Sequence, residues 1–223
     1  SKGIHGVPMA NHVMGYMLAF LRRFPELAAN QKKHTWVRPM PDEATGKRIC
    51  IIGMGNIGQE IARVAKTFDM FVTGIRRTQT PVEFVDEIRP TEALDAVLAK
   101  ADFTIMLLPI NEQTRGFMTT QRFAAMKPGS YFINVGRGQT VDEAALADAL
   151  RSGHLGGAAL DAFEEEPLPE DSPLWDMPNV LITPHLAADT PFYMNRAFAL
   201  AAKNLMRLQA GQPLLSQVDL NDR

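Results

Sequence analysis

The amino-acid sequence predicts an α/β fold built on a doubly wound parallel sheet. Short apolar runs alternate with segments of helical length over most of the 223 residues, which is the pattern of strands joined by crossover helices. The runs are apolar along their whole length, as expected when helices cover both faces of a sheet. A glycine-rich turn directly after the first strand completes the pattern.

The elements follow one another in a regular order. A helix is predicted over residues 8–24, with Pro8 in its first turn, and residues 35–47 form a surface connection rich in proline and glycine. Strands are then predicted over residues 48–52, 70–75, 103–108, 131–135, 157–160 and 180–182. Helices are predicted over residues 56–68, 91–100, 121–126, 143–151 (capped by Asp142) and 191–210, with Gly211 ending the last.

The first predicted helix carries more apolar residues than one face can hold, Met14 and Met17 among them. A helix of this kind must be buried on two sides, or it leaves a large exposed apolar patch. We therefore expect the protein to form a homodimer through this helix.

The composition excludes several classes of partner. Hydrophobic residues make up 46% of the chain and charged residues 22%, and the net charge is −2, so we expect neither nucleic acid nor a membrane as partner. The single cysteine, Cys50, lies in an apolar run and fits a cytoplasmic location. We expect no signal peptide before the first helix. The sequence has no HExxH or CxxC pattern, so we also expect no metal site.

A GxGxxG pattern formed by Gly53, Gly55 and Gly58 lies between the first strand and the next helix. Gly53 permits the tight turn, Gly55 lets a pyrophosphate approach the backbone, and Gly58 lets helix and strand pack closely. The helix N-terminus at Asn56 and Ile57 supplies N–H groups for phosphates. A chance glycine-rich turn is the alternative, but strand, helix and second strand are in register with the motif. The sequence therefore predicts a Rossmann-type dinucleotide site.

The end of the second strand indicates which dinucleotide is bound. NAD-binding proteins carry an acidic residue there, which binds the ribose hydroxyls. Here the strand ends in Arg76, Arg77 and Thr78, whose guanidinium and hydroxyl groups suit a 2′-phosphate. We expect NADP(H) to be preferred, with NAD(H) still able to bind; two solvated arginines are the alternative.

Three polar residues follow predicted strands, at the sheet edge where open α/β folds bind ligands. Arg137 lies between two glycines after the fourth strand, Glu166 lies in the loop after Asp161, and His185 follows the sixth strand. A histidine with a carboxylate is a common acid/base pair, and arginine binds carboxylates. Each also has a structural alternative: a loop histidine that only packs, an arginine that caps a turn, and a solvated acidic run. Spacing alone does not pair His185 with Glu166.

These motifs together resemble the D-isomer-specific 2-hydroxyacid dehydrogenase family, which includes D-3-phosphoglycerate dehydrogenases and glyoxylate/hydroxypyruvate reductases. The resemblance covers residues 3–219 and rests on the glycine motif, residues 107–109 with Thr114, and residues 134–138, 160–167 and 178–185. It implies that Arg137 binds the substrate carboxylate and polarises its carbonyl, that Glu166 orients and charges His185, and that His185 exchanges the proton. Asp161 would hold the nicotinamide carboxamide.

Motifs and resemblance together define an expected cofactor site. Its residues are Gly53, Gly55, Asn56, Ile57, Gly58, Arg76, Arg77, Thr78, Leu108, Pro109, Thr114, Val135, Asp161 and His185.

Two features depart from the family pattern. Arg76 replaces the usual acidic residue, which the resemblance relates to NADP-dependent reductases. The family's N-terminal substrate domain is absent, so we expect residues 1–210 to form the cofactor domain and residues 211–223 a tail that returns to the absent domain. We expect a chain that begins at Ser1 without methionine to be a piece of a longer protein, and this piece to bind NADPH but to turn over slowly.

The expected function is hydride transfer between NADP(H) and a small 2-keto or D-2-hydroxy acid. The alternative is a non-catalytic, redox-sensing module of the corepressor type that shares this fold. Retention of Arg137, Glu166 and His185 disfavours that alternative, whereas the missing substrate domain favours it.

Overall fold

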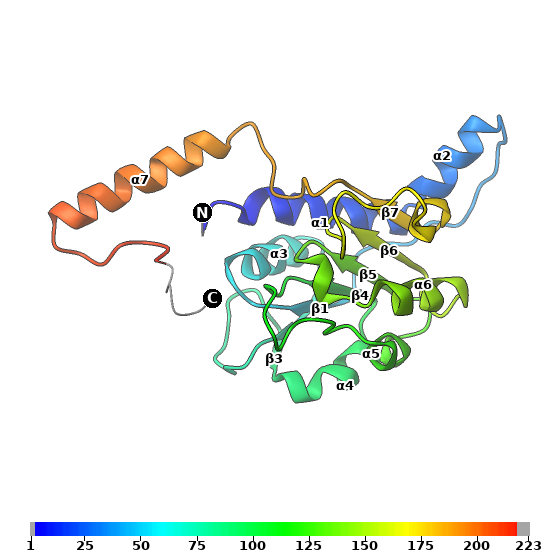
Figure 1. The fold of residues 1–223 in the computed structure, drawn as a ribbon, viewed down its shortest axis with the longest axis horizontal. Helices are drawn as coiled ribbons and strands as arrows, with labels where there is room; N and C mark the ends of the chain where they lie inside the picture. Colours follow the sequence, from blue (N-terminus) through cyan, green and yellow to red (C-terminus); the bar gives the residue numbers. More distant parts are fainter. Residues whose placement is uncertain (1–2, 218–223) are drawn as a thin grey trace.

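A parallel seven-stranded sheet forms the centre of the computed structural model, which describes residues 3–217 (Figure 1). The strand order is β3-β2-β1-β4-β5-β6-β7, so the direction of winding reverses between β1 and β4. The strands are β1 (Arg48–Ile52), β2 (Phe71–Ile75), β3 (Glu87–Arg89), β4 (Phe103–Met106), β5 (Tyr131–Asn134), β6 (Gly157–Leu160) and β7 (Val180–Ile182). This arrangement confirms the predicted doubly wound sheet.

Helices cover both faces of the sheet. One face carries α1 (Gly6–Leu21) and α3 (Asn56–Lys66), and the other carries α4 (Leu94–Leu98), α5 (Thr120–Ala125) and α6 (Glu143–Arg151). Successive residues of β1 point to opposite faces, so Ile49 and Ile51 belong to the first core while Cys50 and Ile52 belong to the second. The central strands are buried on both sides, which is why they are apolar throughout.

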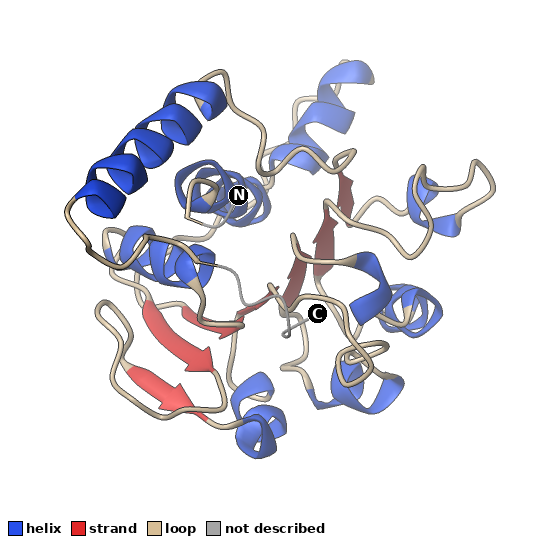
Figure 2. Cartoon of the chain, turned by 60° about the vertical axis from the view of Figure 1, so that its left-hand side comes forward, coloured by secondary structure: helices blue, strands red, loops and turns tan. Residues whose placement is uncertain are grey.

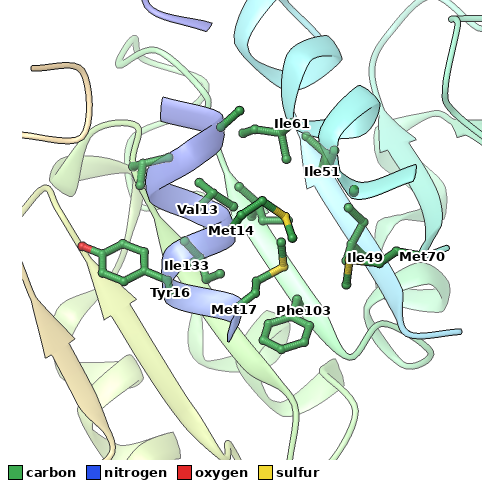
Figure 3. Close-up of a cluster of buried hydrophobic side chains, with 14 of the residues drawn as sticks. Val13, Met14, Tyr16, Met17, Ile49, Ile51, Ile61, Met70, Phe103 and Ile133 are labelled. Carbon is green, nitrogen blue, oxygen red and sulfur yellow. The ribbon is translucent and has the colours of Figure 1, made fainter. Parts of the chain in front are cut away.

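The first helix lies inside one of these cores (Figure 3). Met14 is 4% exposed and Met17 is fully buried, in a cluster with Ile61 of α3 and Phe103 of β4. The expectation that this helix presents its apolar residues to a second copy is therefore wrong, because α3 and the sheet of the same chain already bury them.

Two helices extend away from the sheet (Figures 1 and 2). The helix predicted over residues 8–24 ends early, and α2 (Phe24–Lys32) restarts after Arg23, whose φ is 58°. Pro25 lacks an N–H, and its ring prevents α1 from continuing through it. On the opposite side of the molecule, α7 (Tyr193–Gln209) ends before Gly211 as predicted. Neither α2 nor α7 contains a buried residue.

Most other predicted elements are present, with ends shifted by a few residues. The sequence analysis missed β3, a three-residue edge strand with charged residues at both ends. The helix expected over residues 91–100 divides into a 3₁₀ turn (Thr91–Ala93) and α4, and two further 3₁₀ turns occupy Gly138–Thr140 and Pro173–Asp176. Residues 218–223 of the predicted tail lie outside the described residues.

Three further observations concern membrane-spanning helices, metal sites and the single cysteine. Within residues 3–217, no helix combines the length and the hydropathy needed to cross a lipid bilayer. The same residues include no cluster of three or more histidine, cysteine, aspartate or glutamate side chains suited to a metal ion. Cys50 is a free thiol, and burial raises its pKa to about 12.

Candidate active site

The glycine motif forms the turn between β1 and α3, as predicted. Gly53 has a φ of 111°, in the region that favours glycine, and its backbone lies against Leu107. A side chain at Gly58 would overlap the carbonyl oxygen of Gly53, whereas no atom lies within 4 Å of the Cβ position at Gly55. Gly55 is the N-cap of α3 and offers no capping side chain, so the N–H groups that begin with Asn56 are available to a ligand. The turn therefore fits a pyrophosphate.

A cavity of about 350 Å³ lies beside this turn, at the carboxyl ends of β1 and β2. Six predicted residues line it: Gly53, Arg76, Arg77, Leu108, Pro109 and Thr114. The sequence analysis did not name the other seven lining residues as site residues; one of them, Met54, lies within the glycine motif. The seven are Ile52, Met54, Ile75, Thr91, Asn111, Gln113 and Phe117. Thr114 holds the rim together, since its hydroxyl donates to the carbonyl oxygen of Pro109 at 2.6 Å and accepts the N–H of Asn111 at 2.8 Å.

The two arginines of the cavity differ in exposure, Arg76 being half-buried and Arg77 exposed. Neither takes part in any of the ion pairs formed within residues 3–217. Their charges are thus available to an anionic ligand. Thr78 is exposed and does not line the cavity.

His185 and Glu166 form a hydrogen-bonded pair at the carboxyl edge of the sheet. Nδ1 of His185 lies 2.7 Å from Oε2 of Glu166, whose Oε1 accepts the N–H of Phe163 at 3.0 Å. A histidine that donates from Nδ1 keeps Nε2 available for proton exchange with a ligand. Burial alone would raise the pKa of Glu166, but the bonds from His185 and Phe163 and the charges of His185 and Arg137 together lower it. The structure thus forms the pair that spacing alone left open.

Arg137 follows β5, and its side chain is exposed. Its backbone is held in place, because its carbonyl oxygen accepts hydrogen bonds from Asn134 Nδ2 at 3.2 Å and from Thr140 Oγ1 at 2.6 Å. A side chain at Gly138 would overlap the backbone of Phe163, so this glycine lets the Arg137 loop contact the loop after β6. The sequence analysis included Asn134 in the 134–138 motif without giving it a role, and it missed Thr140.

Asp161 is 2% exposed at the end of β6. Its carboxylate accepts the hydroxyl of Thr183 and the N–H groups of Leu186 and Ala187, both at 2.9 Å. It therefore anchors the turn that carries the histidine, and its contact with a cofactor stays a prediction. Val135, also expected at the cofactor site, is buried after β5.

A sequence model of the D-isomer specific 2-hydroxyacid dehydrogenase family, NAD binding domain, matches residues 14–187. The chain belongs to this family. The matched range contains the glycine motif and also Arg137, Glu166 and His185, so the D-2-hydroxyacid dehydrogenase resemblance and the Rossmann-type cofactor domain are both confirmed.

Curated relatives of this domain include two kinds of named enzyme. D-3-phosphoglycerate dehydrogenase of Mycobacterium tuberculosis (strain ATCC 25618 / H37Rv) is 37% identical over 221 residues, which cover 95% of this chain and 40% of the relative. Glyoxylate/hydroxypyruvate reductase B of Escherichia fergusonii is 38% identical over 210 residues, covering 91% of this chain and 64% of the relative. The chain therefore spans less than two thirds of the length of either protein.

Solved structures of the same family superimpose closely. The NADPH-dependent glyoxylate/hydroxypyruvate reductase of Sinorhizobium meliloti, in complex with NADP and sulfate, has a TM-score of 0.88 and 37% identity, over 98% of this chain and 70% of that chain. A D-isomer specific 2-hydroxyacid dehydrogenase from Xanthobacter autotrophicus Py2, in complex with NADPH and MES, has a TM-score of 0.87 and 39% identity, over 98% and 89%. These comparisons give no support to the corepressor alternative.

Proposed function

We propose that this protein reduces a small 2-keto acid to the D-2-hydroxy acid with NADPH. The observation that carries the proposal is the His185–Glu166 pair, with Arg137 on the neighbouring loop, at the same sheet edge as the dinucleotide turn. When bound, the cofactor supplies a hydride for the keto carbon. The family relatives named for glyoxylate and hydroxypyruvate suggest acids of that size.

The proposed roles of the side chains follow from their chemistry. Arg137 binds the carboxylate of the acid and draws electron density from its carbonyl. His185 donates a proton from Nε2 to the carbonyl oxygen, and takes it back in the reverse direction. Glu166 accepts from Nδ1, which fixes the orientation of the ring and stabilises its charged form. Proton transfer of this kind contributes about 10²- to 10⁴-fold to a rate.

The preference for NADP(H) is a second part of the proposal. Arg76 and Arg77 line the cavity beside the turn and have no ion-pair partner within residues 3–217, so a 2′-phosphate would meet two available guanidinium groups. NADP and NADPH are bound in two of the related structures. NAD(H) binding uses the same turn and loses only the contacts to the phosphate.

We also propose the domain division expected from the family. Residues 1–210 would form the cofactor domain, and residues 211–223 would lead into a substrate domain that lies outside this chain. No residue of α7 is buried, and the helix lies apart from the sheet (Figure 2), which agrees with this division. The free, buried Cys50 agrees with a reducing, cytoplasmic location.

A homodimer remains part of the proposal, through a different surface. Trp36 is 94% exposed and Met40 is 85% exposed in the connection after α2, and Val37 of the same connection and Phe24 and Leu27 of α2 are exposed as well. An exposed apolar group of this size marks an interaction site in a stable protein. Sedimentation should show a dimer that dissociates in the Trp36→Glu/Met40→Glu variant with an unchanged melting temperature. A native monomer would refute this part.

The reaction is tested on the natural gene product, by following NADPH absorbance after glyoxylate or hydroxypyruvate is added. We expect turnover in the ordinary enzyme range of about 1 to 10³ per second, with the D-hydroxy acid as product. NADPH binding without turnover of any small 2-keto acid would refute the proposal and favour the corepressor-type alternative.

A further inference from the structure

The hydroxyl of Thr183 is the centre of a polar network that joins the first helix to the turn of His185. Tyr16 of α1 places its hydroxyl 2.5 Å from Thr183 Oγ1, and Nε2 of His12, one helical turn earlier, lies 3.1 Å from the same oxygen. On its other side Thr183 donates to Asp161. Figure 3 shows the ring of Tyr16 at the border of the apolar cluster, with its hydroxyl directed away from the methionines.

The donors and acceptors of this network are fixed by chemistry. An ionised carboxylate only accepts, so the proton of the Thr183 hydroxyl is committed to Asp161. Thr183 Oγ1 then accepts from Tyr16 and His12 through its lone pairs. Burial raises the pKa of Tyr16, and burial also lowers the pKa of His12, so both groups are neutral donors near pH 7. All three hydrogen bonds therefore form together only when Tyr16 and His12 donate to Thr183 and Thr183 donates to Asp161.

The same network holds His185 from both sides. His185 has a φ of 53°, in the left-handed region that a residue with a side chain adopts only when its surroundings impose it. Before it, Thr183 binds Asp161 and also accepts the N–H of His185 at its carbonyl oxygen, at 3.0 Å. After it, the N–H groups of Leu186 and Ala187 donate to the same Asp161 carboxylate.

We propose that Thr183 is a positioning residue that fixes the left-handed turn of His185, and that Tyr16 and His12 extend this control to α1. Nothing in the network touches the dinucleotide turn, which lies three strands away across β4, β5 and β6. The network therefore sets the geometry of the proton donor and does not reach the turn that would bind the cofactor's pyrophosphate. Its catalytic meaning rests on the proposed function, whereas its structural effect does not.

The test is nitrogen-15 NMR of the histidine rings in the 223-residue chain. In the native protein, neutral His185 should carry its proton on Nδ1, because Nδ1 donates to Glu166. Thr183→Val removes the threonine hydroxyl at nearly constant side-chain volume, and Tyr16→Phe removes the tyrosine hydroxyl that donates to it. In both variants we expect a smaller fraction of neutral His185 with its proton on Nδ1, and the decrease should be larger in Thr183→Val than in Tyr16→Phe. Thr183→Ser keeps a hydroxyl and should keep the native fraction.

Two controls separate positioning from general stability. Tyr131→Phe also removes a tyrosine hydroxyl, from a partly buried ring at the amino end of β5. This end of the strand is opposite to the carboxyl edge that carries His185, so the variant should leave the His185 signals unchanged. NADPH affinity should change much less than kcat in Thr183→Val, because the glycine turn and the two arginines stay unaltered. In the natural gene product, kcat with glyoxylate should fall at least about tenfold in Thr183→Val.

An unchanged His185 tautomer in folded Thr183→Val would overturn the proposal. If that variant does not fold, an unchanged tautomer in Tyr16→Phe overturns it. The NMR result needs no turnover, so it stands or fails independently of the reductase assignment. Absence of reductase activity in the native product would instead refute the proposed function alone.

Discussion

The two halves of the carboxyl edge of the sheet are built in different ways. At β1 and β2, one contiguous turn with Gly53, Gly55 and Gly58 forms the dinucleotide loop, and its shape comes from backbone atoms. At β5, β6 and β7, three separate loops bring together Arg137, Glu166 and His185, and side-chain hydrogen bonds hold them.

This difference has a physical consequence. A backbone turn is sensitive to any added atom, since Gly58 has no space for a side chain. A set of loops held by hydrogen bonds is sensitive to the loss of single polar atoms, such as the hydroxyl of Thr183. Substitutions in one half should therefore leave the other half working, and four measurements can break or sharpen this separation.

The largest effect is expected from His185→Ala. Loss of the proton donor should lower kcat for reduction of glyoxylate by about 10²- to 10⁴-fold in the natural gene product, while NADPH affinity changes far less. Exposed His34 provides the control, since His34→Ala should alter neither quantity. A parallel loss of NADPH affinity in His185→Ala would show that the two halves are not independent.

The Arg76→Ala/Arg77→Ala variant tests the other half. A charge-assisted hydrogen bond contributes about 1.5 to 3 kcal/mol, so NADPH affinity should fall roughly tenfold to a hundredfold while NADH affinity changes little. Fluorescence titration with both cofactors measures the ratio, and Arg38→Ala at the exposed connection is the control. Equal losses for NADPH and NADH would contradict the assignment of these arginines to the 2′-phosphate.

Two glycine variants separate packing from ligand access. Gly58→Ala introduces a carbon that overlaps the Gly53 carbonyl oxygen, so the free energy of unfolding should fall by about 1 to 3 kcal/mol and NADPH affinity should fall with it. Gly55→Ala meets no atom within 4 Å and should weaken only NADPH binding. Denaturant unfolding measures the stability of both variants, and titration measures their NADPH affinity. A Gly55→Ala protein that is as destabilised as Gly58→Ala would refute the distinction between packing and ligand access.

The smallest effect concerns acid stability. The pKa of Glu166 is lowered in the folded protein. The His185–Glu166 pair therefore stabilises the fold at pH values above 4.5, the ordinary pKa of glutamate. This stabilisation is lost as the pH falls through the lowered pKa. Both side chains are more than a third exposed, which keeps the effect below about 1 kcal/mol. The difference in unfolding free energy between native protein and Glu166→Gln should shrink on acidification from about pH 6 to about pH 3. A difference that grows instead would contradict the assignment.

The separation also explains what could be predicted from the sequence. The strand–turn–helix unit with its glycine motif was predicted correctly because every part is local in the chain, and β1 has the predicted bounds. The end of α1 at Leu21 and the new helix from Phe24 were missed because the apolar pattern continues to residue 24. The short strand β3 was missed because its three residues carry no strand pattern of their own. It is a strand only because it pairs with β2.

The sequence by itself determined the α/β class, the position of the dinucleotide turn, and which residues stand at the strand ends. Only the tertiary structure decided that His185 meets Glu166, that α1 is buried within its own chain, and that Thr183 joins Tyr16 to Asp161. The physical reason is distance along the chain. Helix periodicity and glycine turns act over a few residues, whereas these contacts join residues 19 to 167 positions apart, which approach only after the parallel strands have paired.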